Sequence, residues 1–152
     1  MQVTFGVSSK DVMLKEAEKL LNDHWKECAG WKDKIFLNPD WEKYQKLQDL
    51  GIVKPYELRI DGELNGYIVI LFNNHLHYKD DIFAHVDVLF VSEKARKGMS
   101  AIRFMKYVEK EMRNLGASVM SYHIKIQHDY PALFKRLGYE PNEKIYAKCL
   151  KG

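Results

Sequence analysis

Residues 84–98, AHVDVLFVSEKARKG, decide the fold prediction for this chain. Their apolar part belongs to a segment, residues 82–91, whose Val, Leu and Phe content predicts a strand. The strand runs into a short basic turn that ends in glycine, and residues 99–115 then have helical periodicity. A strand, a Lys/Arg/Gly turn and a helix start bring backbone N–H groups together on a phosphate. The stretch therefore predicts a ligand that carries a pyrophosphate.

The first third of the chain predicts one strand and two helices. Val3–Val7 has the composition of a strand, and Ser8 is placed to cap a helix whose apolar stripe ends near Cys28. Pro39 precedes a second, shorter helix over residues 40–50.

Strands are predicted through the middle of the chain. Apolar and polar residues alternate over residues 56–60, and Asp61-Gly62 is a strong signal for a tight turn. Residues 67–72 form a continuous apolar run, which is typical of a strand buried on both faces. The polar residues 73–81 then predict a longer loop.

The last third predicts a strand at residues 118–126, a short helix at residues 131–138 and a final strand at residues 144–150. The whole order is strand, two helices, three strands, helix, strand, helix and strand. It predicts one α/β (mixed α+β) domain over residues 1–152, with a mixed, mostly antiparallel, twisted central sheet and helices on both faces.

Composition limits the class of protein. Of the 152 residues 46% are hydrophobic and 30% are charged, which is typical of a globular domain, and no apolar run approaches the ~20 residues of a membrane span. The net charge of +3 fits an anionic ligand and is too weak to indicate nucleic acid. Cys28 and Cys149 lack the spacing of metal ligands and are interpreted as reduced thiols, so we expect a cytoplasmic protein.

Two motifs, about 40 residues apart and in matching order, carry a family resemblance. The first is the turn at residues 96–101, RKGMSA, and the second is residues 130–139, YPALFKRLGY. With them the chain resembles the GNAT superfamily of acetyl-CoA-dependent N-acetyltransferases, best over residues 84–150. It also resembles acetyltransferase-like proteins of tailed phages.

The resemblance implies acetyl-CoA as cosubstrate, an amine acceptor of unknown identity and a possible homodimer. Backbone amides of the turn would hold the pyrophosphate, with added charge from its first two residues; the turn comprises Arg96, Lys97, Gly98, Met99, Ser100 and Ala101. The strand backbone at Leu89, Phe90 and Val91 would bind the pantetheine arm, along which the short helix with Phe134 would also lie.

Acetyl transfer to an amine needs a base, because an alkylammonium has a pKa near ~10.4. Asp87 is the first candidate and His85 the second, and regular alternation would place both on one face of the strand with Leu89. Phe134 stands where the family often has a tyrosine that protonates the leaving thiolate. Tyr130, Tyr139, water or unassisted departure would replace it.

One alternative remains open, and two other interpretations of the sequence are less favoured. The phenylalanine at position 134 and Ser100 in place of a glycine also fit a non-catalytic binding or accessory protein. The basic face of residues 103–113 is interpreted as a solvated surface rather than a nucleic-acid site. No metal site is predicted, although the histidines and aspartates between residues 75 and 85 have ligand chemistry; these are His75, His77, Asp80, Asp81 and His85.

Overall fold

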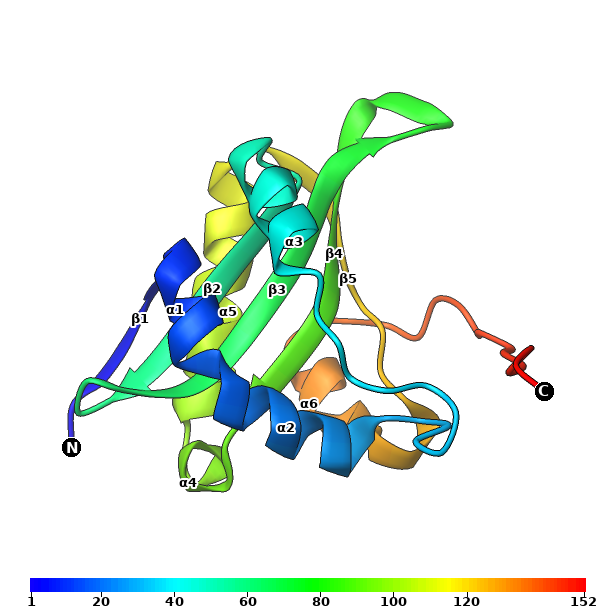
Figure 1. Cartoon of the computed structure of the whole chain (residues 1–152). Coiled ribbons are helices and arrows are strands. Elements are labelled where there is room, and N and C mark those ends of the chain that lie inside the picture. Colours follow the sequence, from blue (N-terminus) through cyan, green and yellow to red (C-terminus); the bar gives the residue numbers. More distant parts are fainter.

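A computed structural model describes the backbone of all 152 residues and every side chain except those of Lys10, Met13 and Leu14. One five-stranded sheet has the order β1-β2-β3-β4-β5 (Figure 1). The strands are β1 (Val3–Val7), β2 (Val53–Ile60), β3 (Glu63–His75), β4 (Tyr78–Val91) and β5 (Ala117–Tyr122). Neighbouring strands are antiparallel except for β4 and β5, which are parallel. The mixed, mostly antiparallel sheet predicted from sequence is confirmed.

Helices cover both faces of this sheet (Figure 1). They are α1 (Lys10–Lys15), α2 (Ala17–Cys28), α3 (Trp41–Asp49), α4 (Glu93–Arg96), α5 (Ser100–Asn114) and α6 (Pro131–Arg136), with a 3₁₀ turn at Ile126–His128. On one face, α5 buries Phe104, Met105, Val108 and Met112 against the sheet, and α6 adds Leu133 and Phe134. On the other face, Ala17 and Leu20 of α2 and Trp41 and Tyr44 of α3 pack over the sheet.

Strand β4 is paired differently along its length. Its partner β3 follows it from Tyr78 to Val91, whereas β5 accompanies it only from Ile82 to Val86. Beyond Val86 the two parallel strands separate, so the last five residues of β4 have no strand on that side. The sheet therefore forks at the point where β5 ends at Tyr122.

A β-bulge lies at this fork. Val69 of β3 pairs with Val88, and its neighbour Ile70 pairs with Val86, so Asp87 is an extra residue without a partner. Val86 faces the α5 side and Val88 faces the α2–α3 side, although two residues of a regular strand would share one face. The prediction that His85, Asp87 and Leu89 share a face is therefore wrong: Leu89 packs on the α5 side, while His85 lies opposite Ala84 and Val86.

Turn and cap residues explain several element boundaries. Asp61 and Gly62 both have positive φ, 49° and 82°, as a two-residue hairpin turn requires, which confirms that prediction. Asp40 caps α3 by accepting from the Lys43 N–H at 3.0 Å. Ser9, not the predicted Ser8, caps α1; the Ser8 hydroxyl is buried and donates to Glu57.

Three further sequence predictions differ from the structure. The single helix predicted up to Cys28 is interrupted at Glu16 and forms α1 and α2. The predicted loop at residues 73–81 is a long hairpin in which β3 and β4 continue beyond the sheet, since His75 still pairs with Tyr78. The predicted strand at residues 144–150 does not form, and β5 ends four residues earlier than expected.

Candidate functional site

The open half of β4 leads directly to the basic turn. After Val91, Ser92 caps the one-turn helix α4, and its hydroxyl accepts from the Ala95 N–H at 3.3 Å. Lys97, Gly98 and Met99 then connect α4 to the start of α5. Gly98 has a φ of 76°, a conformation that glycine adopts without steric cost. The turn thus bends sharply and brings the α5 N-terminus to the end of the open strand edge.

The backbone amides of this turn have no hydrogen-bond partner among the described residues. The first hydrogen bond of α5 joins the Arg103 N–H to the Met99 carbonyl at 2.9 Å. No hydrogen bond among the described residues uses the six backbone N–H groups from Lys97 to Ile102. Met99 provides no side-chain cap, and the first turn of α5 has no acidic residue. Free N–H groups at the positive end of a 15-residue helix suit an anion.

Arg96 is occupied by protein groups. Its Nε donates to the Val91 carbonyl at 2.8 Å, and its Nη2 lies 2.8 Å from the Glu27 carboxylate. The bond to Arg96 lowers the pKa of Glu27. Arg96 therefore connects the turn to α2, and its charge is already paired with the Glu27 carboxylate. In the turn, the donors that have no partner among the described residues are the backbone amides of the residues after Arg96.

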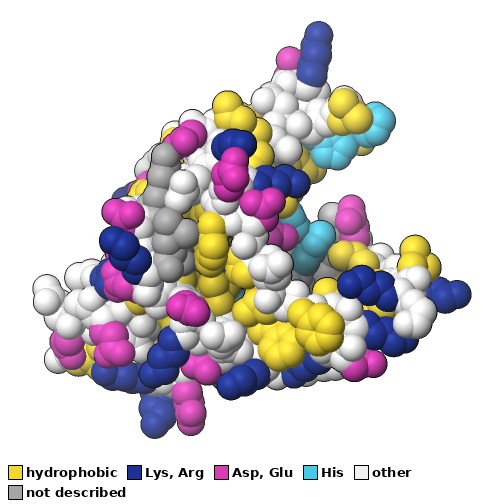
Figure 2. Space-filling view, in the orientation of Figure 1, with side chains coloured by type: hydrophobic (Ala, Val, Ile, Leu, Met, Phe, Trp, Pro, Cys, Tyr) yellow, Lys and Arg dark blue, Asp and Glu magenta, His cyan; other side chains and the backbone are white. Residues whose placement is uncertain are grey.

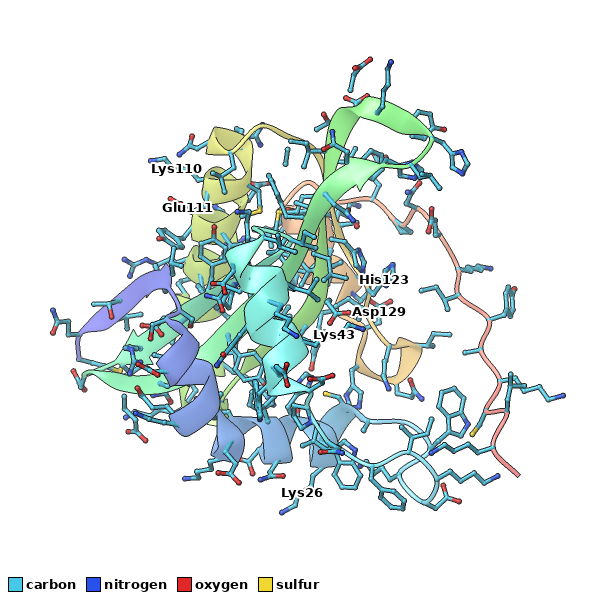
Figure 3. The ribbon with its side chains drawn as sticks, turned by 45° about the horizontal axis from the view of Figure 1, so that its top comes forward. Lys26, Lys43, Lys110, Glu111, His123 and Asp129 are labelled. Atoms are coloured by element: carbon cyan, nitrogen blue, oxygen red, sulfur yellow. The ribbon has the colours of Figure 1, made fainter. Side chains whose placement is uncertain are left out.

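A histidine pair lies where the sheet forks. His85 of β4 and His123, which follows β5, have ring centroids only 3.7 Å apart, and Figure 3 shows His123 beside the strands. His85 Nδ1 is 2.8 Å from the Ser121 hydroxyl oxygen. Burial and the neighbouring His123 lower the pKa of His85, against weaker opposing effects from Asp87 and Glu143. His85 is therefore held neutral at neutral pH.

The bulged Asp87 is exposed and lies near His85. It lies close enough to Tyr44 to raise the pKa of that phenol, although burial is the larger cause. The Tyr44 hydroxyl is buried and has no hydrogen-bond partner among the described side chains and backbone. Figure 2 shows the surface hollowed in this region, below the projecting hairpin, with histidine and acidic side chains on its floor.

The aromatic residues of the second motif are placed differently from one another. Phe134 packs within 5.1 Å of Tyr122 and 6.0 Å of Tyr139, measured between ring centroids. The Tyr139 hydroxyl donates to Glu109 of α5 at 3.2 Å, and burial and that carboxylate raise the pKa of Tyr139. Tyr130, the residue before α6, is 54% exposed and lies near Arg96.

The structure thus brings together most of the residues singled out from the sequence. His85, Asp87 and the strand end Leu89–Phe90–Val91 border the fork, and the turn from Arg96 to Ala101 continues from it. Tyr139 stands apart because its hydroxyl is held on the α5 side. The sequence reasoning missed His123; the one available signal was the alternation in residues 119–123, which continues a strand pattern as far as His123.

The histidines of the hairpin do not join this site. His75 pairs with Tyr78 at the hairpin end, whereas His85 pairs with Leu71, seven residues farther along β4, or roughly 23 Å at the rise of a strand. Among the described residues, no group of three or more His, Cys, Asp or Glu side chains is arranged to hold a metal ion. None of the described helices is long and apolar enough to cross a membrane.

Comparisons with known proteins give a clear result for the fold and none for the sequence. No protein-family model matches the chain, and no curated protein matches it significantly. Solved structures do match. A ribosomal-protein-alanine N-acetyltransferase from Brucella melitensis biovar Abortus 2308 has a TM-score of 0.74 at 14% identity, covering 99% of this chain and 100% of that one.

Two other matches were solved with ligands. An aminoglycoside acetyltransferase from an uncultured soil metagenomic sample, in complex with sisomicin, has a TM-score of 0.75 at 14% identity and covers 98% of this chain and 97% of its own. A predicted acetyltransferase from Clostridium acetobutylicum, with acetyl-CoA, has a TM-score of 0.70 at 9% identity, with 98% and 97% covered. At these identities the likeness shows the fold.

Proposed function

Since the chain has the fold of the GNAT N-acetyltransferases, we propose that it transfers an acetyl group from acetyl-CoA to a primary amine. One observation carries this proposal: six amides without a partner among the described residues, from Lys97 to Ile102, follow the part of β4 from Asp87 to Phe90 that has no strand on one side. An anion site and an open strand edge in line suit a ligand with a diphosphate at one end and an extended amide-containing arm.

The residues present fit acetyl-CoA. The amides from Lys97 to Ile102 hold the diphosphate, and the exposed Lys97 adds a positive charge. The backbone of Leu89 and Phe90 is available to the amides of the pantetheine arm, as in strand addition. Acetyl-CoA supplies an acetyl group already activated as a thioester, so positioning of the two substrates is the main task of the protein.

Asp87 and His85 divide the work on the acceptor amine. The exposed carboxylate of Asp87 binds the incoming ammonium group, and the neutral imidazole of His85 accepts its proton. His123 helps to keep His85 neutral, and Ser121 fixes the orientation of its ring through Nδ1. The unpaired hydroxyl of Tyr44 is a hydrogen-bond donor for the acceptor on the same side of the sheet.

The reaction forms a C–N bond and breaks the C–S bond of the thioester, and the departing thiolate takes up a proton. Phe134 has no proton to give, and the Tyr139 hydroxyl is held by Glu109. Tyr130 is exposed and lies near Arg96 of the turn, so we assign the proton donor role to Tyr130. A thiolate leaves readily near neutral pH, so this role contributes less to the rate than the base does.

A second function is favoured by one feature. Phe134 is packed among Tyr122 and Tyr139 without a hydroxyl, which also suits a protein that binds acyl-CoA and catalyses nothing. The two functions differ in turnover but share the binding site. Release of CoA thiol in the presence of an amine panel therefore separates them.

A pair of glycine variants tests the binding site. Gly98 and Gly116 stand at opposite ends of α5, both have positive φ (76° and 89°), and an added Cβ meets no atom within 4 Å at either position. Gly98→Ala and Gly116→Ala should each lower the free energy of unfolding by about 1 kcal/mol. Titration calorimetry with CoA should show about tenfold weaker binding for Gly98→Ala only, because that turn must change shape.

The Gly116→Ala control separates an effect on the unpaired amides from an effect on the stability of α5. The Gly116 N–H already donates to the Arg113 carbonyl at 3.1 Å, so that end of α5 has nothing to offer a ligand. Absence of any acyl-CoA binding by the wild-type chain would refute the proposal. Equal weakening by the two variants would refute the assignment of the diphosphate to the turn.

A further inference from the structure

His24 is a half-buried histidine of α2 to which the proposed reaction gives no role. Its Nδ1 lies 3.0 Å from the hydroxyl oxygen of Tyr67 on β3. The same ring stacks on Phe90 of β4, with ring centroids 5.0 Å apart and 23° between the ring planes. One side chain of α2 therefore contacts both strands in the part of the sheet where β5 no longer accompanies β4.

The Phe90 ring is enclosed by side chains from three elements and is 5% exposed. Besides His24, the guanidinium carbon of Arg96 lies 5.6 Å from its centroid. The ring of Tyr67, its partner across the strand pair, lies 5.9 Å away. Arg96 is in turn bound to Glu27, which is three residues after His24 on α2. Side-chain packing thus supports the open half of β4 on the side of α2.

The charge state of His24 suits both contacts. Burial is the main cause that lowers the pKa of His24; Glu27 opposes it, whereas Lys125 and Arg96 add to it. A ring that is neutral at neutral pH does not repel the Arg96 cation, and one of its nitrogens can accept a hydrogen bond. Burial also raises the pKa of Tyr67, so its hydroxyl stays protonated and donates to His24.

The position of His24 on α2 is otherwise that of a core residue. It follows Ala17 by seven residues and Leu20 by four, on the face of the helix that packs on the sheet. An apolar residue at this position would leave the fully buried Tyr67 without its hydrogen-bond partner, which is costly. Histidine provides the ring for Phe90 and the nitrogen for Tyr67 in a single side chain.

We propose that His24 is a positioning residue for acyl-CoA, because its stack on Phe90 fixes the open half of β4 in the place where the pantetheine arm binds. This inference rests on the proposed function, since it requires that edge to receive the arm. A strand with a neighbour on one side only loses conformational freedom when a ligand pairs with it, and this loss weakens binding. His24 acts through Phe90 and touches no reacting atom, so it affects the binding of acyl-CoA and not the transfer step.

Two substitutions of His24 separate its two contacts. His24→Asn keeps a polar group close to the place of Nδ1 and removes the ring, whereas His24→Phe keeps a ring and removes the nitrogen. His24→Asn should raise the KM for acetyl-CoA and the calorimetric Kd of CoA about fivefold, the effect of one aromatic stack, with kcat within twofold of wild type. His24→Phe should keep both constants within twofold and lower only the melting temperature.

Val53→Ala is the matched control for loss of stability. Val53 is 4% exposed and belongs to the same core cluster as Phe90, but it lies on β2 and pairs with Leu71. This variant should lower the melting temperature and leave the KM for acetyl-CoA unchanged. An equal rise of KM in Val53→Ala and His24→Asn would mean that general destabilisation weakens binding, and it would overturn the inference.

Phe90→Leu tests the same stack from the other side, and it decides the question if His24→Asn does not fold. It should raise the KM for acetyl-CoA by a similar factor, and the double variant should show no further rise, because the two changes remove one contact. An unchanged KM in Phe90→Leu, additive effects, or a lower kcat at constant KM would overturn the inference. Thiol release by wild type tests the proposed function separately, so an active wild type with insensitive variants refutes the role of His24 alone.

Discussion

The two halves of β4 differ in how the sheet completes them. From Ile82 to Val86 the strand lies between β3 and β5, while from Asp87 to Val91 it has β3 alone. Both halves are apolar and both contribute to the core. The candidate site therefore comes from an interruption of strand pairing and not from an unusual composition. The closed half positions His85, and the open half offers its edge to a ligand.

The two ends of α5 repeat this contrast. At the C-terminal end, the Leu115 and Gly116 N–H groups donate to carbonyls of the last turn. At the N-terminal end, six successive N–H groups have no acceptor among the described residues. A positive-φ glycine stands at each end, so the glycine itself is not the signal of a binding site. The signal of a binding site is the set of amides around Gly98 that have no acceptor among the described residues.

Deletion of Asp87 should have the largest effect on this contrast. Val86 and Val88 already pair with the adjacent residues Ile70 and Val69, so the shortened strand would be regular and would keep its core. We expect a folded protein that is less stable by about 1–2 kcal/mol, and acetyl transfer at least ~100-fold slower, because the bulge and its carboxylate are gone. Thermal unfolding and a thiol-release assay measure the two effects.

Deletion of Val86 is the matched control. It removes one residue from the closed half and puts Asp87 in a position that is 2% exposed, where a carboxylate costs several kcal/mol. This variant should not fold. If the Asp87 deletion variant kept an acetyl-transfer rate within tenfold of wild type, the bulge would not belong to the site. If the Asp87 deletion variant failed to fold, as the Val86 deletion variant should, the bulge would be needed for the core.

The second prediction compares the two tyrosines of the second motif, Tyr130 with its exposed side chain and Tyr139 with its hydroxyl bound to Glu109. Tyr130→Phe should lower kcat about tenfold with little change in stability, because its exposed hydroxyl is the assigned proton donor to the thiolate. Tyr139→Phe should leave kcat unchanged and cost about 1 kcal/mol, since its hydrogen bond to Glu109 is structural. Steady-state kinetics and thermal unfolding of both variants should show this crossed pattern, and the reverse pattern would exchange the two roles.

The sequence predicts the order of the elements and the place of the turn well, because both follow from local patterns. Periodicity in residues 99–115 and the Asp61-Gly62 turn each depend on near neighbours in the chain. The glycine at position 98 and the lack of an acidic residue in the first turn of α5 can likewise be read from neighbouring residues in the sequence. The prediction of a diphosphate at this turn therefore needs no tertiary information, and it stays a prediction until binding is measured.

Sequence alone does not predict the fork or the bulge, because both depend on pairing between distant residues. Alternation predicts His85 and Leu89 on one face, and only the register of β3 against β4 shows the change of phase at Asp87. His123 meets His85 because β5 runs parallel to β4 and ends at Tyr122, which is 36 residues from Val86. The strand predicted at residues 144–150 fails in the single chain because nothing pairs with it there.

The smallest predicted effect concerns the pH dependence at the fork. The groups that act electrostatically on His85 are His123 beyond β5, Asp87 on its own strand and Glu143 in the tail. If the neutral form of His85 accepts the proton, kcat/KM falls as the pH decreases through the pKa of His85, which lies below the usual 6.5. His123→Gln removes a like charge, so the pKa of His85 and the acidic limb should move to higher pH.

Glu143→Gln should shift the pKa of His85 in the opposite direction to His123→Gln. The carboxylate raises the pKa of His85, so its neutralisation should move the acidic limb to lower pH. NMR titration of the His85 ring protons in each variant should shift in the same direction as the rate profile. If neither substitution moves the acidic limb of the pH–rate profile while the NMR titration of the His85 ring does move, another group takes the proton. The exposed Asp87 would then be the base, and the closed half of β4 would serve only to support the open half.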